Sequence, residues 1–526
     1  MCLRKGLAMS AATSSRSVAQ ACSATNVPPS GEPHVAVVET HTSILVFVGD
    51  MVYKGKKPVT FPFLDLSTPA ERLENCRREL ELNRLVAPDV YLGLSELRPL
   101  YLPGAIGEPL LVMRRMPSRR RLSTILDRGE DADRWLSDVA RQVAALHRRE
   151  LPLEGFGLAR TMRALWREGR EQLIPFEGRV LPRTDLDAVS ALAEEYLDGR
   201  VALLDERERS GFVRAGHGDL LSEDIFCLDD GARILDCLEF DERLRGGDVV
   251  LDAAFLAMDL EAHGHADAGR RFLERYEQLE RTAAPASLVD HYIAYRAFVR
   301  AKVESLRSGQ GAAGALGAAR DLLTLCRHHL DAARVHLVLL GGLPGSGKSS
   351  VAAALDTEDP SGRQWMTLSS DVVRKELAGR QPLVSAAAPY RTGLYTEART
   401  QATYAELLRR AAAALAGGMN VVLDASWSDG LFRLQARELA AGAHVALTEA
   451  RCEAPLDVCA HRLGVRAISA SDADPAVLAA IAADAAPWPE AHPVPTATTP
   501  AAAARIVQRL LEAAPQPTST HQEATP

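Results

Sequence analysis

The sequence predicts two domains of the α/β class, a mixed α+β domain over residues 35–330 and a doubly wound α/β domain over 333–513. Length is the first reason, because 526 residues exceed what one ordinary hydrophobic core holds. The second is an apolar run, Val335 to Leu340, that reads as a buried strand and leads into a glycine-rich turn and an alanine-rich helix start. The third is a group of short strands before residue 113, followed by long stretches of helical periodicity.

The glycine-rich turn fits the phosphate-binding pattern G-x-x-x-x-G-K-[ST]. Glycines let backbone N–H groups curl round a β-phosphate, and the helix that follows points its N-terminus at it. In this pattern Lys348 reaches the β/γ oxygens and Ser349 ligates Mg²⁺. Because a strand precedes the turn and a helix follows it, a chance match is a poor alternative, and we expect ATP to bind here with Mg²⁺. The expected nucleotide-binding residues are Gly342, Leu343, Pro344, Gly345, Ser346, Gly347, Lys348, Ser349 and Ser350.

A lysine and a glutamate in the first domain are candidates for an ion pair of a nucleotide site, in which the glutamate fixes the lysine. Residues 42–53 predict a hairpin whose second strand ends in Lys54. Residues 68–71, TPAE, have the cap, proline and glutamate of a helix start, and this helix carries Glu79. Kinase-like N-lobes use such a pair to fix the α/β-phosphates. A surface lysine and a surface glutamate are the alternative.

Three aspartates farther along form the layout of a catalytic loop. Asp219 follows His217-Gly218, Asp224 comes five residues later, and Asp236 follows a short strand. In this layout Asp219 accepts or orients the proton of an attacking hydroxyl, while Asp224 and Asp236 hold Mg²⁺. An acidic loop over a hairpin is the alternative, but three carboxylates at this spacing favour the functional interpretation.

His217-Gly218-Asp219 with Asp236 resembles the aminoglycoside phosphotransferase family, which has a protein-kinase-like fold. Asp248 and Asp252 resemble that family's next helix, whose aspartate braces the catalytic loop. A closer resemblance, from about residue 39 to 513, is to bacterial bifunctional proteins that fuse such a domain to a polynucleotide kinase/zeta toxin-like P-loop kinase domain. The segments that carry it are VYKGKKPVTFPFLDLST, APDVYLG, DCLEF and LAMDLE.

Two positions depart from the pattern of the phosphotransferase family. Asp224 stands at the family's metal-binding Asn, and Leu221 stands at its usual His. Aspartate still binds Mg²⁺, but the added charge crowds the site. A degenerate, regulatory kinase fold is therefore an alternative for the first domain.

In the second domain the resemblance implies four further roles. Asp371 and Arg374 resemble the D-x-x-R of polynucleotide-kinase-like enzymes, in which the aspartate activates the acceptor hydroxyl and the arginine holds the acceptor or a phosphate. Asp424 resembles a Walker B aspartate that orients the Mg²⁺ shell. Arg462 and Arg466 resemble lid arginines. A helix-capping Asp371 and solvated arginines are the alternatives.

Composition excludes several classes of protein. No apolar run is long enough to cross a membrane, and the eight cysteines show no C-x-x-C spacing, so we expect a cytoplasmic protein with reduced thiols. A net charge of −8 and the lack of a basic tract argue against nucleic acid as a partner. Only seven of the 61 basic residues are lysines, so each lysine suggests a specific need. Residues 1–34 and 514–526 read as a disordered leader and a disordered tail.

The sequence thus predicts an ATP- and Mg²⁺-dependent phosphotransferase that acts on a hydroxyl of a small molecule, most securely through the second domain. The alternative is a nucleotide-dependent regulatory or toxin-like protein with a degenerate first domain. The acceptor cannot be named from these residues.

Overall fold

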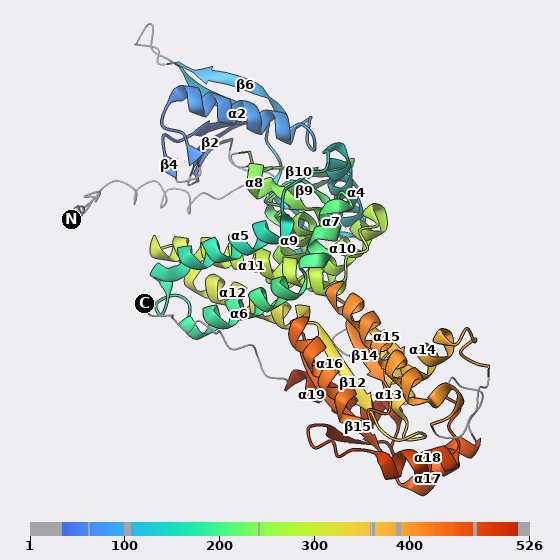
Figure 1. The fold of residues 1–526 in the computed structure, drawn as a ribbon. Coiled ribbons are helices and arrows are strands. Elements are labelled where there is room, and N and C mark those ends of the chain that lie inside the picture. The colour runs from blue at the N-terminus through green and yellow to red at the C-terminus, as the bar shows by residue number, and fades with distance from the viewer. Residues whose placement is uncertain are drawn as a thin grey trace.

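The computed structural model describes residues 34–40, 42–61, 64–98, 107–239, 242–357, 359, 363–384, 391–465 and 471–513. Figure 1 shows three bodies in a row: a small lobe built on a sheet, a helical lobe, and an α/β domain at the far end. The first two together have the two-lobed architecture of protein kinases, so the predicted fold class is confirmed for both domains. None of the helices in the described ranges is both long enough and apolar enough to cross a bilayer.

The small lobe is a five-stranded antiparallel sheet with strand order β1-β2-β3-β7-β6. Helix α2 (Pro69–Asn83) packs on it, and the predicted capping box is present, because Thr68 and Glu71 bond each other's backbone N–H. A short ribbon, β4 (Thr60–Phe61) and β5 (Leu64–Asp65), lies before the helix. The sheet strands are β1 (Val35–Glu39), β2 (Ser43–Val48), β3 (Met51–Lys56), β6 (Tyr91–Leu97) and β7 (Glu108–Arg114).

The helical lobe holds two short antiparallel strand pairs, β8 (Val213–Ala215) with β11 (Gly246–Asp248) and β9 (Ile225–Leu228) with β10 (Gly231–Ile234). Its central helix is α9 (Val249–Ala262), which is buried along almost its whole length. The other helices are α3 (Leu122–Asp127), α4 (Asp133–Arg149), α5 (Leu158–Leu173), α6 (Arg183–Gly199), α7 (Val201–Arg209), α8 (Glu242–Arg245), α10 (Ala266–Glu280), α11 (Ala286–Gly309) and α12 (Ala315–Ala333), with 3-10 turns η1 (Ser118–Arg120), η2 (Ile174–Phe176) and η3 (Ser222–Asp224).

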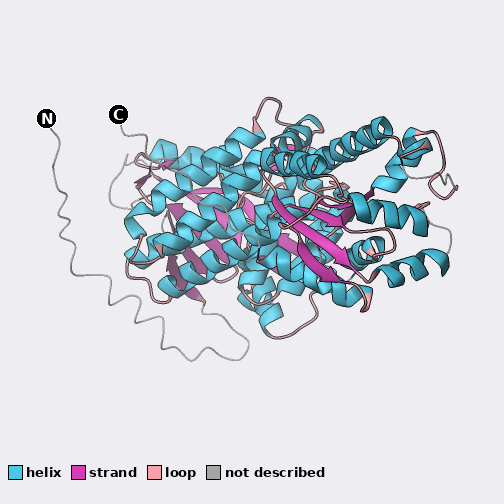
Figure 2. Cartoon of the chain, turned by 60° about the horizontal axis from the view of Figure 1, so that its bottom comes forward, coloured by secondary structure: helices cyan, strands magenta, loops and turns pink. Residues whose placement is uncertain are grey.

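The α/β domain is a parallel sheet with strand order β13-β14-β12-β15-β16, and helices lie on both of its faces (Figure 2). The strands are β12 (His336–Gly341), β13 (Trp365–Ser369), β14 (Asn420–Asp424), β15 (Ala446–Glu453) and β16 (His492–Pro495). The helices are α13 (Lys348–Thr357), α14 (Ser370–Leu377), α15 (Glu397–Ala416), α16 (Gly430–Gly442), α17 (Leu456–Val465), α18 (Pro475–Asp484) and α19 (Pro500–Glu512), with a 3-10 turn η4 (Gly393–Tyr395). The chain leaves β12 toward one edge and β14 toward the other, so the carboxyl ends of these neighbours form the switch point where such sheets bind ligands.

Strand β12 faces two different cores. Leu337 and Leu339 belong to a cluster that continues into the helical lobe, whereas Val338 and Leu340 belong to a second cluster under α13 and α19. This division follows from the two-residue period of a strand, and burial on both faces explains why the run is uniformly apolar.

The helical lobe and the α/β domain are joined by this common core. Helix α12 runs past residue 330 and enters β12 after a two-residue connection. Arg200 of the helical lobe lies at the contact between the two domains. It is 1% exposed and donates to the carbonyl oxygens of Leu415 (2.7 Å), Ala443 (2.6 Å) and His444 (3.1 Å). These carbonyls end α15 and α16, so a cation from one domain caps two helices of the other.

We predict that Arg200→Ala lowers the free energy of unfolding by about 3 kcal/mol, because it removes three hydrogen bonds of about 1 kcal/mol each from buried carbonyl groups. Denaturant unfolding of the full chain, followed by tryptophan fluorescence, measures the effect. Arg209→Ala is the control, since Arg209 is exposed and pairs only locally with Glu206. An unchanged midpoint for Arg200→Ala would contradict the assigned role.

Candidate functional site

The phosphate loop joins β12 to α13, as the sequence predicts. Gly342 and Gly345 have positive φ angles of 133° and 80°, and a Cβ on either would lie 2.5 Å from a backbone oxygen of Cys452 or Cys459. These two glycines are therefore required by close packing against β15 and α17 as well as by the turn.

Two predicted ligands of the nucleotide and the metal lie at the start of α13. Ser349 donates through its hydroxyl to Asp424 Oδ2 at 2.6 Å, across the switch point between β12 and β14. Lys348 Nζ donates to the carbonyl oxygens of Gly342 (2.9 Å) and Leu343 (3.1 Å), so the loop's own backbone holds the lysine. Burial raises the pKa of Asp424, and Lys348 and the Ser349 hydroxyl oppose that shift.

Arg462 of α17 lies against the phosphate loop. Its guanidinium donates to the carbonyl oxygens of Thr496 (2.6 Å) and Gly345 (3.4 Å), which argues against the alternative of a solvated arginine. The Thr496 hydroxyl in turn donates to Ser346 O at 2.5 Å, so the end of β16 supports the loop. Arg466, the second predicted lid arginine, lies outside the described residues.

A cavity of about 1260 Å³ extends from the phosphate loop to the first turn of α14. Lys348, Ser349 and Asp424 line this cavity, and so do Asp371 and Arg374. Arg374 donates to Asp371 at 2.7 Å. The alternative in which Asp371 caps the helix is wrong, because α14 begins at Ser370 and its N-cap position is Ser369.

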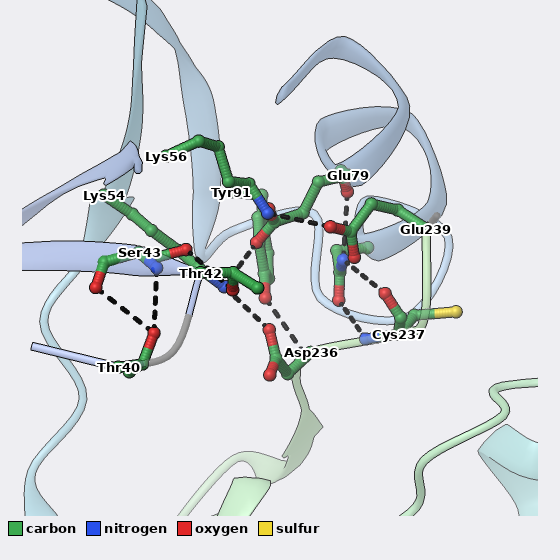
Figure 3. A network of polar contacts seen from close by, with 11 residues as sticks. Thr40, Thr42, Ser43, Lys54, Lys56, Glu79, Tyr91, Asp236, Cys237 and Glu239 are labelled. Carbon is green, nitrogen blue, oxygen red and sulfur yellow. Dashed lines mark hydrogen bonds and ion pairs between the residues drawn. The ribbon is translucent and has the colours of Figure 1, made fainter. Parts of the chain in front are cut away.

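The small lobe brings Lys54 and Glu79 together at 2.8 Å, and Lys54 also contacts Asp236 at 2.8 Å (Figure 3). The alternative of a surface pair is wrong, because the side chain of Glu79 is fully buried. Burial alone would lower the pKa of Lys54, but Asp236 and Glu79 together raise it well above its usual value. The lysine is thus a permanent cation at the junction of the two lobes.

A second lysine, Lys56, extends this network. Its Nζ lies 2.6 Å from the other oxygen of Glu79 and 2.8 Å from Glu239, three residues after Asp236 (Figure 3). Lys54 and Lys56 are two residues apart on β3, so they point to the same face of the strand. Glu79 is therefore held by two cations, and each cation also reaches a carboxylate of the helical lobe.

The loop predicted to be catalytic, which carries Asp219, is braced by α9. Asp252 accepts from the backbone N–H groups of His217 (2.8 Å) and Gly218 (2.7 Å), and His147 lies 3.0 Å from the same carboxylate. Although burial opposes it, the hydrogen bond from His147 holds the pKa of Asp252 below its usual range. Asp259, two turns along the same helix face, accepts from the N–H of Ser222.

The predicted acid cluster consists of Asp219, Asp224 and Asp236, whose charges affect one another's pKa. Burial raises the pKa of Asp219 to about 6. Burial, and then the charges of Asp236 and Asp219, raise the pKa of Asp224 to about 8. Asp224 thus resists ionisation unless a cation joins the site.

A magnesium ion that keeps its waters and takes phosphate oxygens needs only one or two protein ligands. Nowhere in the described part of the chain do three His, Cys, Asp or Glu side chains converge on a ready-made metal cage. Ser349 with Asp424, and Asp224 with Asp236, fit the sparser kind of site.

Sequence reasoning missed several residues that hold these sites in place. They are Lys56, Glu239, His147, Tyr395, Thr496 and the pair Lys375–Asp472. The rarity of lysine was a usable signal for Lys56 and Lys375. The others are joined to their partners only by the fold.

Comparisons with known proteins found one family model and several solved structures that match parts of this chain. A family model described as an AAA domain matches residues 337–488. A solved choline/ethanolamine kinase family protein from Mesorhizobium loti covers 58% of this chain and 92% of its own, at 14% identity and a TM-score of 0.36. A gluconokinase from Sinorhizobium meliloti 1021 covers 34% of this chain and 92% of its own, at 20% identity and a TM-score of 0.26.

Three curated relatives match along nearly the full length. Two of them are the uncharacterized protein Rv2004c of Mycobacterium tuberculosis (strain ATCC 25618 / H37Rv) and the uncharacterized protein Mb2027c of Mycobacterium bovis. Each is 39% identical over 473 residues, which are 89% of this chain and 94% of the relative. With this identity across both of its domains, the chain belongs to the family of these mycobacterial proteins.

Proposed function

We propose that the α/β domain transfers the γ-phosphoryl group of ATP to a hydroxyl of a small molecule. The observation that carries this proposal is the single cavity that Lys348, Ser349, Asp371 and Arg374 share. A protein that only senses a nucleotide needs the phosphate loop but has no use for a carboxylate facing the space beyond the γ-phosphate. The cavity is large enough for a nucleotide's phosphates and a small acceptor side by side.

In this proposal each residue has one task. The loop N–H groups and Lys348 hold the β- and γ-phosphates, and Arg462 lies where it can balance charge on the transferring group. Asp371 accepts the proton of the acceptor hydroxyl as that oxygen bonds to the γ-phosphorus. The bond from the γ-phosphorus to the bridging oxygen breaks, and ADP leaves with the electron pair. Arg374 keeps the Asp371 carboxylate oriented.

Magnesium is the group that such chemistry requires, and Ser349 and Asp424 would hold it. When bound, it neutralises charge on the phosphate oxygens. The Ser349–Asp424 hydrogen bond keeps both side chains together at the start of α13, where they would serve as ligands of the ion.

We further propose a second nucleotide site between the small lobe and the helical lobe. The contact of Lys54 with both Glu79 and Asp236, beside a braced loop that carries Asp219, supports it. Asp224 at the metal position makes this site depend on divalent cations. A regulatory site that binds a nucleotide without turnover is the alternative.

The two sites can be told apart by their lysines. We predict that Lys348→Ala removes nucleotide binding at the phosphate loop and that Lys54→Ala weakens binding at the second site. Calorimetric titration of the full chain with ATP and Mg²⁺ should therefore lose a different binding event in each variant. Lys57→Ala is the control, because Lys57 lies one residue beyond β3 and pairs with the exposed Glu39. If Lys348→Ala keeps every event of the wild type, the phosphate loop is not a nucleotide site.

Asp371→Asn tests the transfer itself. Asparagine keeps the size and a hydrogen-bond acceptor for Arg374 but is a far poorer base, so we predict a rate of ADP formation lower by roughly 10² to 10⁴-fold. ATP affinity and melting temperature should stay as in the wild type. ADP formation is measured with a defined mixture of sugars, polyols and other small alcohols.

Glu376→Gln on the same helix is the matched control, since Glu376 pairs with Arg410 outside the cavity. Equal rates for the wild type and Asp371→Asn would exclude Asp371 as the base. That result would favour the regulatory alternative over the transferase.

Asp224→Asn tests the crowding of charge at the second site. Without metal, the variant should melt at a higher temperature than the wild type, because it lacks a partly buried carboxyl whose pKa is raised by burial and by the charges of Asp236 and Asp219. Added Mg²⁺ should raise the melting temperature of the wild type more than that of the variant. Equal responses to Mg²⁺ would show that Asp224 holds no metal.

A further inference from the structure

Lys375, the residue after Arg374 on α14, makes a buried ion pair that the proposed reaction does not use. Its Nζ lies 3.1 Å from Asp472 Oδ2 and 3.2 Å from Oδ1, and it donates to Pro382 O at 3.0 Å. The two side chains are 2% and 5% exposed. Because taking both charges out of water costs about as much as the pair returns, stability alone is a poor reason to keep it.

Asp472 lies in residues 471–474, which we call the strap. The strap comes shortly after α17 and leads directly into α18, whose N-terminus is capped by Asp474. Ser471 and Ala473 line the cavity, whereas Asp472 between them reaches Lys375. This alternation is that of an extended chain with one side toward the cavity and the other fastened to α14.

A second set of contacts leads from the strap back to the proposed base. The Asp472 backbone lies close enough to the Tyr395 hydroxyl to lower its pKa, although burial outweighs this effect and raises that pKa to about 12. The Tyr395 ring lies 4.7 Å from the guanidinium of Arg374, which donates to Asp371. This chain of contacts therefore runs from Lys375 on α14 through the strap and Tyr395 of η4 back to Arg374 on α14.

We propose that the strap forms one wall of the acceptor site and that Lys375 and Asp472 are positioning residues. Their buried ion pair fixes the positions of the strap, Tyr395 and Arg374 relative to Asp371. The proposal rests on the proposed function of the α/β domain. It gives the acceptor a polar contact at Ser471 and an apolar one at Ala473.

The pair also explains how the region after β15 is fixed at both ends. Arg462 of α17 holds the nucleotide side through Gly345 O and Thr496 O. Asp472 holds the acceptor side through Lys375. A change at Lys375 should therefore disturb the acceptor and leave the nucleotide contacts intact.

Lys375→Met in the full chain tests the proposal by hydrogen exchange and by kinetics. We expect amide exchange in residues 471–478 and 393–397 to become about tenfold faster or more, with α13 and the phosphate loop unchanged. ATP affinity should change by less than about twofold. The concentration of the sugar and polyol mixture that gives half-maximal ADP formation should rise about tenfold or more, as expected for a lost positioning contact. Lys375→Arg keeps the charge and the donors, so it should recover most of both effects.

Arg410→Met is the control, because it removes a more exposed ion pair of α14, the one between Glu376 and Arg410, which lies outside the cavity. Unchanged exchange in the strap, or faster exchange throughout the α/β domain, would overturn the proposal. If Asp371→Asn forms ADP as fast as the wild type, the proposed function fails whatever the strap does. If Asp371→Asn slows transfer as expected but Lys375→Met leaves the dependence on acceptor unchanged, only the present proposal fails.

Discussion

The hydrophobic core shared by the helical lobe and the face of β12 that carries Leu337 and Leu339 is the constraint on which both candidate sites depend. It buries α9, whose Asp252 and Asp259 hold the backbone of the loop that carries Asp219. It also covers one face of the parallel sheet, whose carboxyl ends present the phosphate loop. A disturbance in the middle of this core would therefore reach both sites, one at the junction of the small and helical lobes and the other in the α/β domain (Figure 1).

Patterns that depend on neighbouring residues were readable from the sequence. The apolar run of β12 and the spacing of glycines around Lys348 predicted a strand, a turn and a helix in the right order. The capping box at Thr68 and Glu71 likewise placed the start of α2. Each is decided by backbone geometry or by a local hydrogen bond, so the chain carries the signal within about ten residues.

Contacts between distant parts of the chain were not readable. Arg200 contacts Leu415 and Ala443, and nothing in the sequence near 200 indicates a cap for helices that end more than two hundred residues later. Lys375 and Asp472 are 97 residues apart, and only the rarity of lysine marks one of them. Residues 309–317 contain four glycines, which favour a loop, yet α12 begins at Ala315, and Ala315 and Ala319 pack into the core. Tertiary burial thus overrode a weak local preference.

The two candidate sites differ in how far cations and hydrogen-bond donors offset their carboxylates. At the phosphate loop, Asp424 stands beside Lys348 and Ser349, so one buried carboxylate is offset by a cation and a hydroxyl donor. Between the lobes, Lys54 already contacts Glu79 and Asp236, and Asp224 adds a further carboxyl that burial and like charge keep from ionising readily. A triphosphate entering the second site must displace Asp236 from Lys54 and bring enough metal to offset the acidic cluster. The phosphate loop demands no such exchange between side chains, since Lys348 is held only by backbone carbonyl oxygens that a phosphate can replace. Within the proposed function, this balance of charge favours nucleotide binding in the α/β domain, and it would make the proposed site between the lobes the more dependent on metal.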